Sequence, residues 1–327
     1  MLERLRQPWS DQRAELVLGA LASFVLLVIV AMIVFVASKA WPSIHHNGLH
    51  FFGSGEDVDK TISRQVNTGA RPTPADYQIR AWPLIYATLL TTGLAVAIGS
   101  VFALFSSVFI VEFAPDRVRK IVVPVVRLLA AVPSVIFGLI GILVLAPFVN
   151  NNLIGDARKR SVEYVVQLTG QSLLVAVVIL TVMITPIMIA IITDALYSVP
   201  KGWKEGAVAL GVNRWRAMWT VSVRAARPAI IAAAVLATAR ALGEGIMLTM
   251  VSGGRGFSPN PLDGITMLFE PLRPLAATIV ENVESLNAPA IRSSVYAFAL
   301  LLLFSSFMLS VGGYLAKQPM KKYGIRV

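Results

Sequence analysis

The sequence predicts an all-α membrane protein with six transmembrane helices, folded as one domain over residues 1–327. Hydrophobic residues make up 56% of the chain and charged residues only 14%, against roughly 25% charged residues in soluble domains. The apolar residues come in long uninterrupted runs, and a run of about 20 crosses a hydrocarbon core about 30 Å thick. There is no cysteine, which excludes disulfides, iron–sulfur clusters and thiolate metal sites.

Six runs are long enough to span a bilayer. They are Leu16 to Ala37, Pro83 to Val111, Ile121 to Val149, Ser172 to Ile192, Pro228 to Val251 and Ser294 to Ala316. Arg4, Arg6 and Arg13 precede the first run, as in a signal peptide. This run is too long for a signal sequence and no A-x-A cleavage site follows, so we expect a retained first span. Prolines interrupt the third and fourth runs and predict kinked helices.

The distribution of Lys and Arg predicts the orientation of the spans. With the N-terminus in the cytoplasm, the inside segments hold 16 basic residues and the longer outside loops hold 11. This excess is the positive-inside pattern and explains the net charge of +11 without a nucleic-acid surface. We therefore expect both termini and residues 193–227 in the cytoplasm, and the long loops 38–82 and 252–293 outside. One segment fits poorly, because Arg158, Lys159 and Arg160 fall in an outside loop.

The segment 193–227 contains a stretch with almost no side-chain bulk, to which another protein can approach closely. Its small residues are Gly206, Ala207, Ala209 and Gly211. Three tryptophans would anchor the segment at the lipid headgroups; they are Trp203, Trp215 and Trp219. The pattern predicts a short surface helix offered to a cytoplasmic partner, and an ordinary connector helix is the alternative.

The spacing E-G-A-x-x-x-G, with Pro228 downstream, resembles the EAA loop of ABC-transporter permeases. Gly206 stands where the second motif letter is usually Ala, and Arg224 stands where a proline of the usual tail is expected. The resemblance implies that this segment docks into a nucleotide-binding subunit. The residues that it assigns to coupling are Glu205, Gly206, Ala207 and Gly211.

Three further blocks resemble the phosphate-specific permeases of the PstC type. They are V-E-F-A-P at Val111 to Pro115, L-L-A-A-V-P-S-V-I-F-G-L-I-G from Leu128 to Gly141, and A-R-A-L-G-E-G-I-M-L-T-M-V from Ala239 to Val251. The resemblance implies a type I ABC importer permease fold in the bacterial cytoplasmic membrane and inorganic phosphate as cargo. It also implies three partners: a PstA-type second permease, a dimer of ATP-binding subunits and an extracytoplasmic phosphate-binding protein.

The fifth run contains Arg240 and Glu244, about 18 Å and 24 Å along a continuous helix from Pro228. An arginine so deep in the membrane costs about 2.5–3.5 kcal/mol and usually faces a polar pathway. The i, i+4 spacing lets the two side chains pair on one helix face. We expect both residues on the substrate pathway, because guanidinium groups match phosphate oxygens. The alternative is that Glu244 only neutralises an arginine packed between helices.

No G-x-x-x-x-G-K-[ST] sequence occurs, so we expect no ATPase site and no cofactor on this chain, with ATP bound by the partner subunit. His45, His46 and His50 lack acidic residues at metal-binding spacing and are predicted to lie in a solvated loop. The run Ser252 to Gly256 predicts a flexible turn, with an anion cradle as the alternative. Rival functions are a permease for sulfate or molybdate, an ion-coupled secondary transporter using the same ion pair as a proton relay, and a membrane-embedded sensor.

Overall fold

The computed structural model describes residues 9–54, 57–68, 71–162, 164 and 167–318. Both chain termini, for which we predicted a cytoplasmic location, lie outside these ranges. The described chain is helical, with one isolated β-bridge between Gly253 and Leu272. Its α-helices are α1 (Trp9–Asn47), α2 (Val58–Asn67), α3 (Trp82–Val108), α4 (Asp116–Ala130), α5 (Ser134–Ile140), α6 (Ala146–Phe148), α7 (Asp156–Val162), α8 (Leu173–Ser198), α9 (Lys201–Ala209), α10 (Arg214–Ala217), α11 (Arg224–Leu242), α12 (Ile246–Val251), α13 (Leu275–Glu281) and α14 (Pro289–Lys317).

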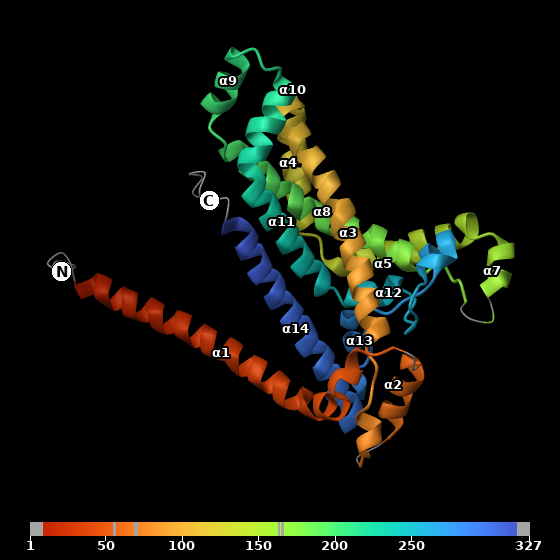
Figure 1. Ribbon diagram of the computed structural model, residues 1–327. Coiled ribbons are helices and arrows are strands. Elements are labelled where there is room, and N and C mark those ends of the chain that lie inside the picture. The colour runs from red at the N-terminus through yellow and green to blue at the C-terminus, as the bar shows by residue number, and fades with distance from the viewer. Residues whose placement is uncertain (1–8, 55–56, 69–70, 163, 165–166, 319–327) are drawn as a thin grey trace.

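Six stretches of the described chain are long and apolar enough to cross a membrane, which confirms the predicted all-α fold with six spans. Figure 1 shows them as an elongated bundle with α9 and α10 at one end and α2 at the other. We call these the α9 end and the α2 end. In the same view α1 leaves the bundle, so that its N-terminal half lies apart from the other helices.

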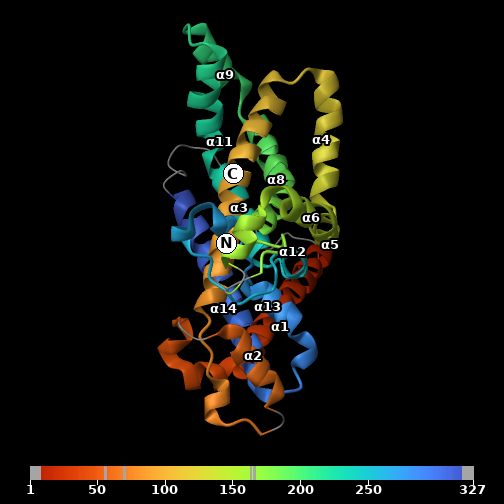
Figure 2. The same ribbon diagram turned by 90° about the vertical axis from the view of Figure 1, so that its right-hand side faces the viewer.

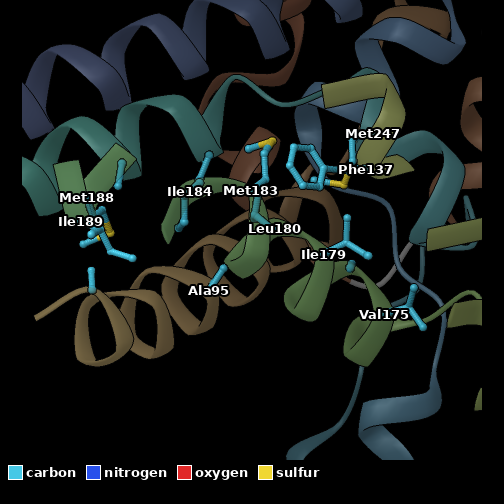
Figure 3. Packing of buried hydrophobic residues seen from close by; sticks show 14 of the residues in the cluster. Ala95, Phe137, Val175, Ile179, Leu180, Met183, Ile184, Met188, Ile189 and Met247 are labelled. Atoms are coloured by element: carbon cyan, nitrogen blue, oxygen red, sulfur yellow. The ribbon is translucent and has the colours of Figure 1, made fainter. Parts of the chain in front are cut away.

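The main core forms around α8. This helix is apolar on all sides, and 61% of its most apolar stretch is buried, against none of the corresponding stretch of α1. A helix that is hydrophobic all round is expected at the centre of a bundle. Figure 3 shows Ile179, Leu180, Met183 and Ile184 of α8 packed among side chains of α3, α5 and α12. The core therefore fixes the positions of α5 and α12, which carry parts of the site.

A second, smaller core lies at the α2 end, where α1, α2, α3, α13 and α14 meet. Asn47, buried at the end of α1, donates to the Tyr77 carbonyl at 2.8 Å and accepts from the Ile79 amide at 2.8 Å. The Ser43 amide of α1 donates to the Ser293 hydroxyl of α14 at 2.7 Å. These buried hydrogen bonds join α1 to the first long loop and to the last span, so the segments at the α2 end pack as one folded unit.

The predicted third span, 121–149, is not one helix. The chain leaves the α-helix after Ala130 and resumes it at Ser134, and the stretch able to cross a membrane is Ser134–Leu153. The cause is Pro133, which has no amide hydrogen and disfavours helical backbone in the residue before it. The preceding helix α4 packs against α8 and has no buried residue of its own. Figure 2 shows α4 running beside the bundle at its α9 end.

Other helices also differ in length from the apolar runs. The first helix extends from Trp9 to Asn47, well beyond the predicted 16–37. Helix α8 continues to Ser198, so the first residues of segment 193–227 extend a span. The segment 252–293, predicted as a long outside loop, contains a 3-10 helix at Pro261–Phe269 and the helix α13.

Candidate functional site

The fifth span breaks where its charged residues lie. Helix α11 ends at Leu242 and α12 begins at Ile246, so Glu244 sits in a non-helical link of three residues. The ion pairs among the described residues do not include one between Arg240 and Glu244. The predicted pairing on one face of a continuous helix is therefore wrong. The glycines on both sides of Glu244 explain the break, because glycine in a helix interior costs about 1 kcal/mol relative to alanine.

Arg240 lies in the last turn of α11 and is half-buried. Its Nε is buried and has no hydrogen-bond partner within the described residues. The last carbonyls of a helix carry partial negative charge, which favours a cation in this turn. They do not use up the directional donors of the guanidinium group, so Arg240 retains the capacity to bind an anion.

Glu244 lines a cleft of about 420 Å³ next to the break. The cleft is walled by the link itself, by α13 and by single residues of α5 and α14; its lining residues are Ser134, Gly243, Glu244, Gly245, Ile246, Ala276, Ile279, Val280 and Leu302. Arg240 does not line this cleft. The structure thus places Arg240 one helical turn before the break and Glu244 in the cleft, rather than side by side.

Ser134 was not singled out from the sequence, although it lies in the V-P-S run that carries the resemblance. Pro133 starts α5 at this serine, which points α5 at the cleft that Glu244 lines. A hydroxyl group both donates and accepts hydrogen bonds. In a cleft lined chiefly by apolar side chains, Ser134 and Glu244 supply the side-chain polar groups.

The predicted surface helix at the α9 end is α9, Lys201–Ala209. Glu205 and Gly206 are exposed, Ala207 is half-buried, and a Cβ added to Gly206 would meet no other atom of the chain within 4 Å. Gly211 has a φ of +84°, with its amide bonded to the Val208 carbonyl at 2.9 Å. The next amide bonds to the Ala207 carbonyl at 3.2 Å, which completes a Schellman ending of the helix. Gly211 therefore ends α9, while Glu205 and Gly206 face outward.

Two sets of contacts attach α9 and α10 to the bundle. Lys204 of α9 forms an ion pair with Glu112, which lies in a π-helical turn at the end of the second span. The Trp215 ring lies 6.0 Å from Phe113 and 5.7 Å from Trp219. The V-E-F-A-P block and the segment 193–227 thus meet in space.

The three histidines are exposed, but the loop predicted for them is wrong, because His45 and His46 lie in the last turn of α1 and His50 lies in a 3-10 helix at Gly48–Phe52. The His46 ring stacks on Tyr77 at 5.2 Å, and its Nδ1 lies 2.7 Å from the Pro42 carbonyl. The described residues contain no cluster of three or more His, Cys, Asp or Glu that could hold a metal ion.

Comparison with known proteins identifies the class. The family model described as "Binding-protein-dependent transport system inner membrane component" matches residues 95–318. The chain belongs to this family, whose members are multi-pass inner-membrane subunits of ABC transporters. The fold agrees: the bacterial alginate ABC transporter, solved with an alginate pentasaccharide-bound periplasmic protein, superposes with a TM-score of 0.58 at 14% identity, covering 96% of this chain and 98% of that chain.

Curated relatives narrow the class further. The probable ABC transporter permease protein YqgH of Bacillus subtilis is 29% identical over 306 residues, 93% of this chain and 90% of the relative. The phosphate transport system permease protein PstC 1 of Mycobacterium tuberculosis is 31% identical over 278 residues, 82% of this chain and 80% of the relative. Within its family, the chain is a permease of the PstC type, which confirms the resemblance drawn from its motifs. The type I importer permease fold is likewise confirmed.

Proposed function

We propose that this chain is the transmembrane permease subunit of a bacterial ABC importer that moves inorganic phosphate across the cytoplasmic membrane. The observation that carries the proposal is the interrupted fifth span, with the unpartnered Arg240 Nε just before the break and Glu244 within it. Discontinuous helices at binding sites are typical of transporters, because unwound backbone is tolerated in a membrane where it lines a cavity. Membership in a family of binding-protein-dependent permeases of the PstC type supports the cargo.

The proposed orientation places the α9 end in the cytoplasm and the α2 end outside, with both termini inside. The greater number of Lys and Arg in the segments at the α9 end supports this assignment. In this orientation the exposed Glu205 and Gly206 face a dimer of ATP-binding subunits. The remaining coupling residues, Ala207 and Gly211, shape the helix. ATP hydrolysis belongs to those partner subunits, because this sequence has no P-loop.

The α2 end then faces the extracytoplasmic phosphate-binding protein, and the exposed face of the bundle pairs with a PstA-type second permease. Phosphate delivered at the α2 end passes the break between α11 and α12. Closure of the ATPase dimer pushes α9, and the Lys204–Glu112 ion pair carries this push to the second span. The spans rock about the break, so that the site opens alternately to each side.

The two charged residues have different roles in this pathway. Arg240 offers planar, permanently charged donors to phosphate oxygens. Glu244 repels a fully deprotonated oxyanion and accepts a hydrogen bond from a phosphate that still carries a proton. Sulfate has no such proton at neutral pH, so a carboxylate at the site favours phosphate over sulfate. Because the two residues are not paired in this structure, the donors of Arg240 remain available to an anion that has passed Glu244.

The test is uptake of labelled phosphate by the complete complex, with its binding protein, in proteoliposomes. Arg240→Gln removes a charge-assisted interaction worth about 1.5–3 kcal/mol, so uptake should fall roughly ten- to a hundredfold. Arg227→Gln, an exposed change on the same helix, is the control and should leave uptake within twofold. Glu244→Gln should lower uptake or relax discrimination against sulfate. Native uptake by both site variants, assembled at normal levels, would refute the assignment.

The same preparation separates the rival functions. Labelled sulfate or molybdate carried in preference to phosphate would change the cargo. Uptake that needs an ion gradient but no ATPase subunit would indicate a secondary transporter. Partner binding without flux of any anion would indicate a sensor.

A further inference from the structure

Arg273, at the α2 end, joins three segments that are far apart in the sequence. Its Nη1 lies 2.9 Å from the Asp59 carboxylate of α2. Its Nε lies 2.9 Å from the Glu281 carboxylate of α13, a charge contact that is not aligned as a hydrogen bond. Its Nη2 donates to the carbonyl of Gly254, in the loop that follows α12. The arginine side chain is only 15% exposed, so this guanidinium group is a partly buried hub rather than a surface charge.

Asp59 binds the same loop a second time. Its two carboxylate oxygens each lie 3.1 Å from the Gly256 amide. A Cβ at Gly256 would come within 2.9 Å of the Val58 Cβ, so the loop lies directly on α2. The segment Ser252 to Gly256, predicted as a flexible turn or anion cradle, is therefore held by the carboxylate of Asp59, which occupies the amide of Gly256.

The hub continues to the cleft through α13. This helix begins two residues after Arg273 and ends at Glu281, and its Ala276, Ile279 and Val280 form one wall of the Glu244 cleft. The wall touches the break itself, since a Cβ at Gly245 would lie 2.8 Å from the Ala276 carbonyl oxygen. Any shift of α13 away from Gly245 thus changes the width of the cleft.

Burial raises the pKa of the Glu281 carboxyl, while the charge of Arg273 acts in the opposite direction. Removing one partner from such a partly buried ion pair leaves the other charges without compensation, which costs more than the pair contributes when intact. The arrangement with all contacts made is therefore favoured over one in which a single contact is broken.

We propose that Arg273 is a positioning residue that holds α13 against the Gly243–Gly245 break and thereby limits the width of the Glu244 cleft. The Asp59–Arg273–Glu281 cluster is a latch that loosens when the cleft widens. This inference rests on the proposed function for the direction of transport, whereas the contact between latch and cleft is independent of the cargo. The latch also gives a partner that docks at the α2 end a direct connection to Glu244.

The natural absence of cysteine makes a single introduced thiol a clean probe of the cleft. Ser134→Cys places it in the cleft wall opposite α13, and its modification by a membrane-impermeant thiol reagent is timed in the assembled complex. Arg273→Gln should speed labelling about tenfold, the shift that loss of one charge-assisted contact produces. Arg273→Lys should give a smaller increase. Arg80→Gln is the matched control, because Arg80 bonds the Ser54 carbonyl at the same end, and should leave the rate unchanged.

A second probe separates positioning from general loosening. Ala233→Cys, at a fully buried position of α11, should remain unreactive in every variant. Labelling that rises equally at both probes would show a merely structural role and overturn the proposal. Equal labelling of the cleft probe with and without Arg273 would overturn it as well.

If Arg273→Gln does not assemble, Asp59→Asn and Glu281→Gln each remove one contact and should each speed labelling. Phosphate uptake is measured in parallel on the parent complex. If the parent complex takes up phosphate but the variants show unchanged labelling, the latch alone is refuted. If the variants label faster but the parent complex takes up no phosphate, the cargo is refuted and the latch is still supported.

Discussion

The two glycines that flank Glu244 offer a matched pair of substitutions with opposite expected results. Gly245 is buried, and a Cβ there would lie 2.6 Å from the Val280 Cγ2 and 2.8 Å from the Ala276 carbonyl oxygen. Gly243 is exposed, and its Cβ would approach nothing closer than 3.7 Å. Both residues have a negative φ, of −83° and −93°, so alanine is compatible with the backbone at each.

The magnitude follows from what must move. A contact of 2.8 Å with a backbone oxygen cannot be relieved by turning a side chain, so Gly245→Ala forces α13 away from the break. Insertion of one extra carbon into a packed site typically costs 1–3 kcal/mol. Gly243→Ala makes only ordinary van der Waals contacts and restricts the unfolded chain, which contributes about 0.4–1 kcal/mol of stability. The free energy of unfolding should therefore fall in Gly245→Ala and rise in Gly243→Ala, with a difference of roughly 1.5–4 kcal/mol between the two variants.

The assay is thermal unfolding of the purified complex, combined with labelled phosphate uptake. Gly245→Ala should unfold at a lower temperature than the parent, and its uptake should fall because the cleft wall has shifted. Gly243→Ala should unfold at the same or a higher temperature. Equal unfolding temperatures for the two variants, or a stable Gly245→Ala with native uptake, would refute the close packing of α13 on the break.

Three further predictions concern other parts of the chain. Lys204→Gln should weaken stimulation of the ATPase by the binding protein, because it leaves the Glu112 carboxylate, 12% exposed, without its cation at a cost of about 1–2 kcal/mol. The double variant Lys204→Glu with Glu112→Lys exchanges the two charges and should recover part of the stimulation. No recovery in the double variant would argue against a direct role of this ion pair. Burial raises the pKa of Glu270, so its ionised form destabilises the fold and the stability of the protein should increase as pH falls through the raised pKa. Glu270→Gln should be at least as stable as the parent at pH 8. The difference in stability between variant and parent should shrink toward pH 4.5, as measured by unfolding at several pH values. Gly211→Ala should destabilise the complex by about 1 kcal/mol because its φ is +84°, whereas Gly206→Ala has open space and should be neutral or slightly stabilising in the same unfolding assay.

The segment around α9 shows how far local sequence could be used. The small residues and the motif spacing predicted a short surface helix, and α9 is that helix. Gly211 at its end follows from local chemistry alone, because a Schellman ending requires a residue with positive φ. The partner of Lys204 could not be predicted in the same way. Glu112 is 92 residues away in the sequence, and only the packing of the second span against α9 brings the two together.

The assignment of Arg240 and Glu244 to the substrate pathway stays a prediction, whereas the predicted shape of the helix that carries them was wrong. An arginine and a glutamate deep in an apolar run are unusual enough to mark a pathway from sequence alone. Their pairing was predicted from the spacing of a continuous helix, and this step was wrong. The signal that the helix breaks was present in Gly243 and Gly245, but glycine is common in membrane helices and does not by itself end one.

The sequence by itself determined that lipid is the solvent, that six helices cross it, and which family of permeases the chain joins, because apolar run length and motif spacing are local properties. Only the tertiary structure decided which residues line the cleft beside Glu244 and that Arg273 connects α2 to the wall of that cleft. Each of these depends on residues distant in the chain. The physical reason is that contacts such as the close approach of α13 to Gly245 arise only when distant segments pack, and no local pattern encodes them.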